Sequence, residues 1–240
     1  MFLKRIVCIL GLFYCSFGYS QTTVKEIFQK MGMQYSAAKP LQYKTSYVLY
    51  KDFDSKKVEE SYNGIFYKNA QNEMYTKIGN TEILNTKKVN LKISHPEKLI
   101  EINNPLPNYL GDFDMKSLLD LCKIEKCIDY KSYWEITLTT KQFSSLPYSR
   151  IIVRISKSYF MQKQVFYYNT ITNFSKDFRK PDAHYPRLEV IYSNFNRNPI
   201  NPSVFSSNTY FTSSGKKSIV LSQKLKKYGI VDQRSVANNN

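Results

Sequence analysis

The chain has 240 residues, 42% of them hydrophobic and 22% charged, which is typical of one or two globular domains with enough apolar material for a core. The absence of any 18-residue apolar run excludes a protein with several membrane-spanning helices. Lysine and arginine outnumber the acidic residues 35 to 19, a formal net charge of +16. Because these basic residues are spread along the chain without a recognition motif, we interpret them as a solvated surface and expect no nucleic-acid partner.

The first twenty residues have the pattern of an export signal. Lys4 and Arg5 precede an apolar stretch over residues 6–17, and small residues at positions 18 and 20 follow it. We therefore expect residues 1–20 to be a signal peptide cleaved before Gln21. This predicts a periplasmic protein, with the outer surface as the alternative.

The mature segment begins with a predicted helix over residues 23–37. Thr23 and Glu26 form a capping-box pattern, and Pro40 stops the helix. The apolar positions at helical spacing are Val24, Ile27, Phe28 and Met31.

From Leu41 the apolar residues recur at every second position, which predicts strands with one buried face. Counts of 20 Tyr and 15 Phe against 8 Gly favour the same conclusion. The strands expected in this half cover residues 41–49, 58–68, 73–78, 81–84, 89–94 and 98–102. Their connections are too short for parallel crossovers, so the sheet should be antiparallel.

A helical interruption is predicted in mid-chain, from Asp114 to Cys122, after an irregular stretch over residues 103–113. Strands resume over residues 130–141, 149–157, 159–170 and 187–196, with terminal candidates at 209–212 and 228–233. No linker rich in glycine or serine and no internal repeat is present. We expect residues 21–240 to form a single β domain, with a C-terminal extension from about residue 193 to 240.

Cys122 and Cys127 are the two cysteines left after cleavage of the signal peptide. In an exported protein this pair is compatible with one disulfide or with two free thiols. A disulfide requires the helix to end near Cys122, because five residues of continuous helix separate the two Cα atoms too far. We expect the disulfide.

Catalytic and metal-binding constellations are not evident in the sequence. Asp112 and Asp114 form an Asp-x-Asp pair, but no further acidic ligands follow at loop spacing, which favours a helix cap. His95 and His184 lie far apart and neither accompanies a nucleophile motif. We therefore expect no enzyme activity, no cofactor and no metal.

The order of these elements resembles the LolA-like periplasmic lipoprotein carriers. The resemblance depends on the segments 133–138, 150–155 and 163–168, with similar early segments at 47–50 and 62–67, and covers about residues 22–192. The lysine- and asparagine-rich style suggests a Bacteroidota-type variant. The resemblance implies a mainly β fold with α, a curved, unclosed antiparallel barrel or sheet under a helical lid. It also implies a monomer that binds the acyl chain of a lipid or lipoprotein on an apolar concave face, with membrane-bound lipoprotein-release machinery as a partner.

Two sets of residues are candidates for such a site. The expected cavity wall consists of Tyr43, Tyr47, Leu49, Phe66, Trp134, Ile136 and Leu138, each on the more apolar face of its strand. The expected lid consists of Ile27, Phe28, Met31, Leu118 and Leu119. The alternative for both sets is ordinary core packing, and the alternative function is a secreted β-sandwich that binds glycan or another envelope protein without small-molecule cargo.

Overall fold

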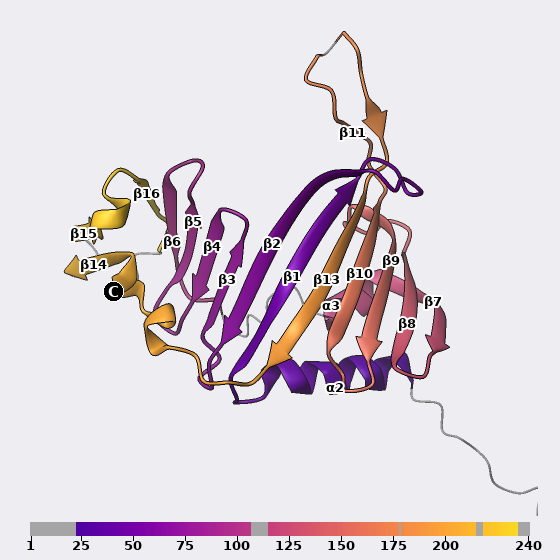
Figure 1. The fold of residues 1–240 in the computed structure, drawn as a ribbon, viewed down its shortest axis with the longest axis horizontal. Coiled ribbons are helices and arrows are strands. Elements are labelled where there is room, and N and C mark those ends of the chain that lie inside the picture. The colour runs from indigo at the N-terminus through magenta and orange to yellow at the C-terminus, as the bar shows by residue number, and fades with distance from the viewer. Residues whose placement is uncertain (1–22, 107–114, 178, 215–217, 235–240) are drawn as a thin grey trace, which may run out of the picture.

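One continuous sheet of 12 strands forms the framework of the protein (Figure 1). The computed structural model describes residues 23–106, 115–177, 179–214 and 218–234. The predicted signal peptide, residues 1–20, lies outside the described residues, as do Asp112 and Asp114. The strand order across the sheet is β16-β6-β5-β4-β3-β2-β1-β13-β10-β9-β8-β7.

The strands of the sheet are β1 Leu41–Tyr50, β2 Val58–Lys68, β3 Met74–Ile78, β4 Thr81–Asn85, β5 Asn90–Ser94, β6 Leu99–Asn103, β7 Cys122–Asp129, β8 Tyr133–Thr140, β9 Tyr148–Ser156, β10 Met161–Tyr168, β13 Arg187–Asn196 and β16 Gly229–Asp232. Two short hairpins stand apart from it, β11 Thr172–Asn173 with β12 Ala183–His184, and β14 Phe211–Ser214 with β15 Ser218–Leu221. The helices are α2 Val24–Ser36 and α3 Met115–Leu121, with short 3-10 turns at η1 Pro202–Phe205, η2 Ser207–Thr209 and η3 Gln223–Leu225.

The expected fold class is confirmed: the sheet is curved, unclosed and antiparallel, with helices against it. A single parallel pair, β16 with β6, departs from this rule. It is possible because the long C-terminal segment returns to the sheet after a connection of far more than a dozen residues. The alternative of a β-sandwich is wrong, because the main strands belong to one sheet instead of two packed sheets.

Helix α2 begins as the sequence predicts. The Thr23 side chain accepts a hydrogen bond from the Glu26 amide at 3.2 Å, and the Glu26 carboxylate accepts one from the Thr23 amide at 2.9 Å. This capping box satisfies amides that the first helical turn leaves without partners. The helix lies along the lower end of the sheet (Figure 1).

Two apolar clusters lie on opposite faces of the sheet. The first lies between the sheet and α2 and includes Tyr43 and Phe66. Phe66 pairs with Thr76 of β3, and Thr76 pairs with Ile83 of β4, so these side chains lie on one face of the sheet. Leu84, the residue after Ile83, belongs to the second cluster. Because successive residues of a strand point to opposite faces, the C-terminal segment covers the other side of β4 to β6.

Two glycines should respond oppositely to replacement by alanine. A Cβ on Gly64 in β2 would clash with Thr45 Oγ1 and lie 2.9 Å from the Lys77 carbonyl oxygen, whereas one on Gly32 in α2 meets nothing within 4 Å. Gly64→Ala should lower the free energy of unfolding by about 1–3 kcal/mol. Gly32→Ala should raise it by about 0.5–1 kcal/mol, because alanine loses less backbone freedom in a helix. Urea denaturation of both variants tests this, and a neutral or stabilising Gly64→Ala would contradict the close packing of β1 on β2.

The expected disulfide between Cys122 and Cys127 is wrong, because both cysteines are free thiols. Helix α3 does end just before Cys122, as a bridge requires, but strand β7 then carries both cysteines. Five extended residues span about 16 Å, well beyond the reach of a disulfide. The sequence prediction missed β7, the edge strand of the sheet, because its charged residues hide the alternation; such charges are common on edge strands.

Candidate functional site

Two rows of mostly apolar side chains cross five neighbouring strands, from β1 to β8, in the half of the sheet that ends at β7. They lie on the face that α2 covers, which we call the concave face. Each row takes one residue from each of β8, β9, β10, β13 and β1. The lower row is Ile136, Val153, Gln164, Val190 and Tyr47, and the upper row is Leu138, Ile151, Phe166, Leu188 and Leu49. Residues of one row point to the same side because they are cross-strand partners.

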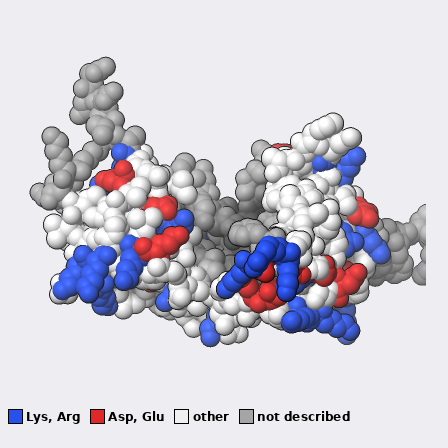
Figure 2. Space-filling model, turned by 90° about the horizontal axis from the view of Figure 1, so that it is seen from above, with Lys and Arg blue, Asp and Glu red and all other residues white. Residues whose placement is uncertain are grey.

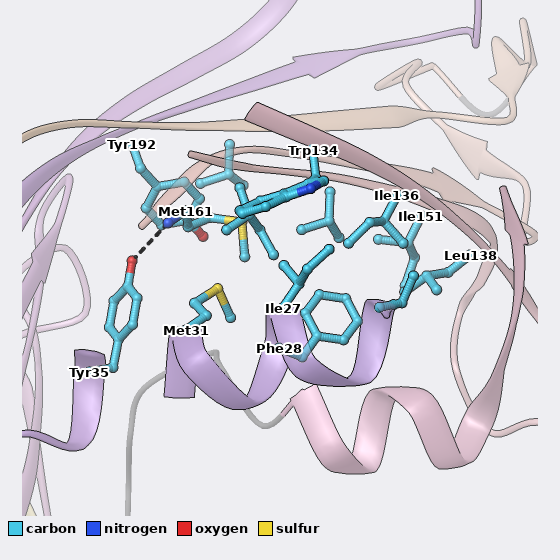
Figure 3. Close-up of a cluster of buried hydrophobic side chains, with 14 of the residues drawn as sticks. Ile27, Phe28, Met31, Tyr35, Trp134, Ile136, Leu138, Ile151, Met161 and Tyr192 are labelled. Carbon is cyan, nitrogen blue, oxygen red and sulfur yellow. Dashed lines mark hydrogen bonds between the residues drawn. The ribbon is translucent and has the colours of Figure 1, made fainter. Parts of the chain in front are cut away.

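Helix α2 packs directly on one end of the concave face (Figure 3). Its Ile27, Phe28 and Met31 are buried and point toward the sheet, where they belong to the same cluster as Trp134 and Ile136. Leu118 and Leu119 of α3 are half-buried against this cluster. The residues expected as a lid therefore lie together over the face.

The residues expected as the cavity wall fall into two groups. Tyr43, Phe66, Trp134, Ile136 and Leu138 are buried. Tyr47 and Leu49 are only half-buried. The first group is thus packed in the same cluster as α2, whereas the second group lies at the margin of the covered area.

Three half-buried side chains extend the apolar surface beyond the predicted set: Tyr148, Phe166 and Leu188. The rings of Tyr148 and Phe166 lie 4.9 Å apart, centroid to centroid. The alternation of apolar residues in β13 indicates that Leu188 lies on the buried face of its strand, but it does not indicate which strands are the neighbours of β13. Seen from above, acidic and basic side chains are mixed on both halves of the molecule (Figure 2).

Two basic side chains, Lys68 and Arg197, donate hydrogen bonds to backbone carbonyl groups at the C-terminal end of α2. Lys68 is buried, and its ammonium group donates to the carbonyl oxygens of Ala37 at 2.6 Å and Lys39 at 3.2 Å. The Arg197 guanidinium donates to the Gln34 carbonyl oxygen at 3.1 Å. Burial, together with the nearby Arg197 charge, lowers the pKa of Lys68 to about 8. Cations at this position also suit the partial negative charge at a helix C-terminus.

Tyr35, in the last turn of α2, adds a third anchor, since its hydroxyl accepts a hydrogen bond from the Met161 amide at 3.2 Å. In the described part of the chain, the hydrogen bonds that join α2 to the sheet lie at this end. The first half of the helix contributes Val24, Ile27 and Phe28 to apolar packing. Apolar contacts are non-directional, so this half can separate from the sheet by giving up that packing and the contact of the Lys30 ammonium, in the middle of the helix, with the Tyr159 ring at 5.4 Å from its centroid.

Trp134, the single tryptophan of the chain, lies between the sheet and α2 (Figure 3). Its indole N–H donates to Asp129 Oδ2 at 3.1 Å, and its ring stacks on Tyr159 with centroids 5.3 Å apart. The Lys157 ammonium lies 3.8 Å from the ring centroid, and its hydrogen bond to Asp129 lowers the pKa of that carboxyl. Trp134 fluorescence can therefore report on this end of the concave face.

Both histidines serve structural roles in ion pairs or hydrogen bonds. His95 joins Glu82 of β4 to Tyr228 of the C-terminal segment, at 2.9 and 2.8 Å. His184, at the base of the β11–β12 hairpin, lies 2.7 Å from an oxygen of Asp182 and 2.8 Å from one of Asp52.

The His184 contacts predict a dependence of stability on pH. Hydrogen bonds to Asp182 and Asp52 raise the pKa of His184. A raised pKa means that the stabilisation is complete below the unfolded value of about 6.5 and is lost as the pH rises through the folded value. The melting temperature of the wild type should exceed that of His184→Gln at pH 6, and the difference should shrink toward pH 9. A difference that grows with pH would contradict this ion pair.

The described residues offer little other chemistry. They hold no group of three or more His, Cys, Asp or Glu side chains placed to bind a metal. They also contain no helix long and apolar enough to cross a membrane.

Comparisons with known proteins find similarity in fold at low identity. No protein-family model and no curated protein matches the sequence. An uncharacterized conserved protein from Thermus thermophilus is 12% identical, with a TM-score of 0.45 over 87% of this chain and 98% of its own. A LolA superfamily protein from Nitrosomonas europaea is 10% identical, with a TM-score of 0.34 over 78% and 99%. A domain described as a putative outer membrane lipoprotein-sorting protein, from Vibrio parahaemolyticus, is 13% identical, with a TM-score of 0.36 over 76% and 96%. Identities of 10–13% and TM-scores of 0.34–0.45 are too low for these likenesses to assign a family or a role to this chain.

Proposed function

We propose that this is an exported envelope protein that binds the acyl chain of a lipid or lipoprotein on the concave face, with α2 as a movable cover. The proposed cavity wall and lid consist of the residues that the sequence indicated. Tyr148, Phe166 and Leu188 are added to the wall. Delivery of lipoproteins to the outer membrane, by exchange with membrane-bound machinery, is the finer role that the sequence resemblance implies.

The observation that carries the proposal is the combination of this face with its cover. Ten side chains in two rows provide a surface that is apolar except for the Gln164 amide and the Tyr47 hydroxyl, and part of it remains half-exposed. The helix over the other part is fixed by hydrogen bonds at its C-terminal end, and elsewhere by apolar contacts and the Lys30–Tyr159 cation–π contact. Such a face can exchange helix side chains for a hydrocarbon chain.

The energetics suit a ligand without directional groups. Burying a methylene group contributes about 0.8 kcal/mol, so a sixteen-carbon chain gains on the order of 10 kcal/mol before ordering costs. That gain can offset the loss of contacts with Ile27, Phe28 and Met31, which the helix would give up on moving.

Titration with a dansyl-labelled fatty acid tests the proposal. The probe should take up energy from Trp134, so tryptophan emission should fall and dansyl emission should rise with a saturable curve. Unlabelled lysophosphatidylcholine should compete with the probe. If the folded wild type takes up neither lipid, the carrier function is wrong and binding of glycan or another envelope protein becomes the better hypothesis.

Export has its own test. The mature protein isolated from the envelope should begin at Gln21, because Lys4, Arg5 and the apolar stretch after them have the pattern of a signal peptide. Mass spectrometry of the intact protein and its N-terminal peptide measures this. Recovery of Met1, or of a diacylated Cys15, would contradict cleavage at this site.

A further inference from the structure

Gln164 is the one side chain in the lower and upper rows of the concave face that carries an amide. It belongs to β10, at the middle of the lower row, with Val153 on one side and Val190 on the other. Its side chain is 3% exposed. A buried amide among aliphatic side chains is costly unless its hydrogen-bonding groups find partners.

One end of this amide has a partner. The Tyr192 hydroxyl donates to Gln164 Oε1 at 2.5 Å, which fixes the orientation of the side chain. Within the ranges that the structure describes, Gln164 Nε2 makes no hydrogen bond to another residue. The two N–H donors of that nitrogen are therefore available to a ligand on the concave face.

The neighbourhood of Gln164 restricts the chemistry of that ligand. The other members of the two rows are Val, Ile, Leu, Phe and Tyr, so neither row holds a charged side chain that could pair with a carboxylate or phosphate. A neutral carbonyl oxygen is the group that an N–H donor in apolar surroundings binds without the cost of burying a charge. Such an oxygen lies at the start of every acyl chain that is joined by an ester or amide bond.

We propose that Gln164, oriented by Tyr192, binds the carbonyl oxygen of an ester- or amide-linked acyl chain and so selects acylated molecules over alkyl ethers and plain hydrocarbons. This inference rests on the proposed function, because it assigns a polar contact within the same binding face. A pocket with one well-placed donor would thus set the position of the chain along the sheet.

Two lysolipids that differ in this single feature provide the test. We would compare 1-palmitoyl- and 1-hexadecyl-lysophosphatidylcholine, an ester and an ether with the same head group, as competitors of the dansyl probe. The ester should bind the wild type about tenfold more tightly, because the ether leaves a buried N–H without an acceptor. Gln164→Met, close in volume, should bind both lipids with similar affinity and should lose the preference by weakening ester binding.

The outcomes separate the two proposals. If neither lysolipid binds the wild type, the carrier function itself is wrong. If both bind the wild type equally well, lipid binding stands and the role of Gln164 is overturned. Tyr192→Phe is a second variant in case Gln164→Met does not fold, and it should reduce the preference for the ester, because Gln164 loses the bond that orients it. A full preference in either folded variant would also contradict the assignment.

Discussion

Replacing Ile136 with aspartate should lower the free energy of unfolding by about 3–5 kcal/mol. Ile136 is 0% exposed, in the apolar cluster between the sheet and α2, and its cross-strand partners are Cys127 and Val153. The carboxylate would have to be buried unpaired or protonated, and both states are unfavourable. Urea denaturation followed by circular dichroism measures the change.

Ile124→Asp is the matched control for this substitution. Ile124 lies in the neighbouring edge strand β7 and pairs with Leu138, but its side chain is 49% exposed. The same chemical change there should cost less than about 1 kcal/mol, because water can solvate the charge. Equal losses at the two positions would show that α2 does not cover Ile136 more closely than it covers the sheet edge.

Phe166→Arg should weaken acyl-chain binding at least tenfold while leaving the protein folded. The ring is half-buried on the upper row and packs on Tyr148, so the long arginine side chain can reach water. A charge on the apolar face would remove contact area and would have to be desolvated by the ligand. Competition with the dansyl probe gives the affinity, and the thermal melt shows that the fold persists.

A substitution beside the β11–β12 hairpin controls for charge alone. Ile171 is exposed, away from the two rows, and Ile171→Arg adds the same charge there. It should leave probe affinity unchanged. If Phe166→Arg and Ile171→Arg behave alike, the upper row does not belong to the binding face.

Local signals in the sequence predicted much of the fold. The capping box of Thr23 and Glu26 concerns residues three apart, and the structure confirms it. The alternation from Leu41 onward predicted β1 for the same reason, since a buried face repeats at every second residue. Trp134, Ile136 and Leu138 were predicted to share the apolar face of one strand, and all three belong to the cluster that α2 covers.

The remaining features depend on contacts between distant segments. Gln164 lies between Val153 and Val190 because β10 pairs with both β9 and β13. No local pattern in the sequence indicates that this amide is surrounded by apolar side chains from other strands. The contacts of Lys68 with the residues after α2 are likewise visible only once β2 is placed beside the helix end. The cysteine prediction failed because the strand that follows α3 depends on pairing with β8.

The central claim is that α2 moves away from the concave face when a lipid binds, about its fixed C-terminal end. Distances between spin labels test it most directly, with one label on Cys127, an exposed thiol of β7, in a Cys122→Ala background. The second label is placed at Lys25→Cys near the start of α2, or at Met33→Cys near its end; Lys25 is exposed and Met33 is 64% exposed. On addition of 1-palmitoyl-lysophosphatidylcholine, the distance from Cys127 should change markedly for the label at position 25 and little for the label at position 33. Saturable lipid binding with both distances unchanged would contradict the claim.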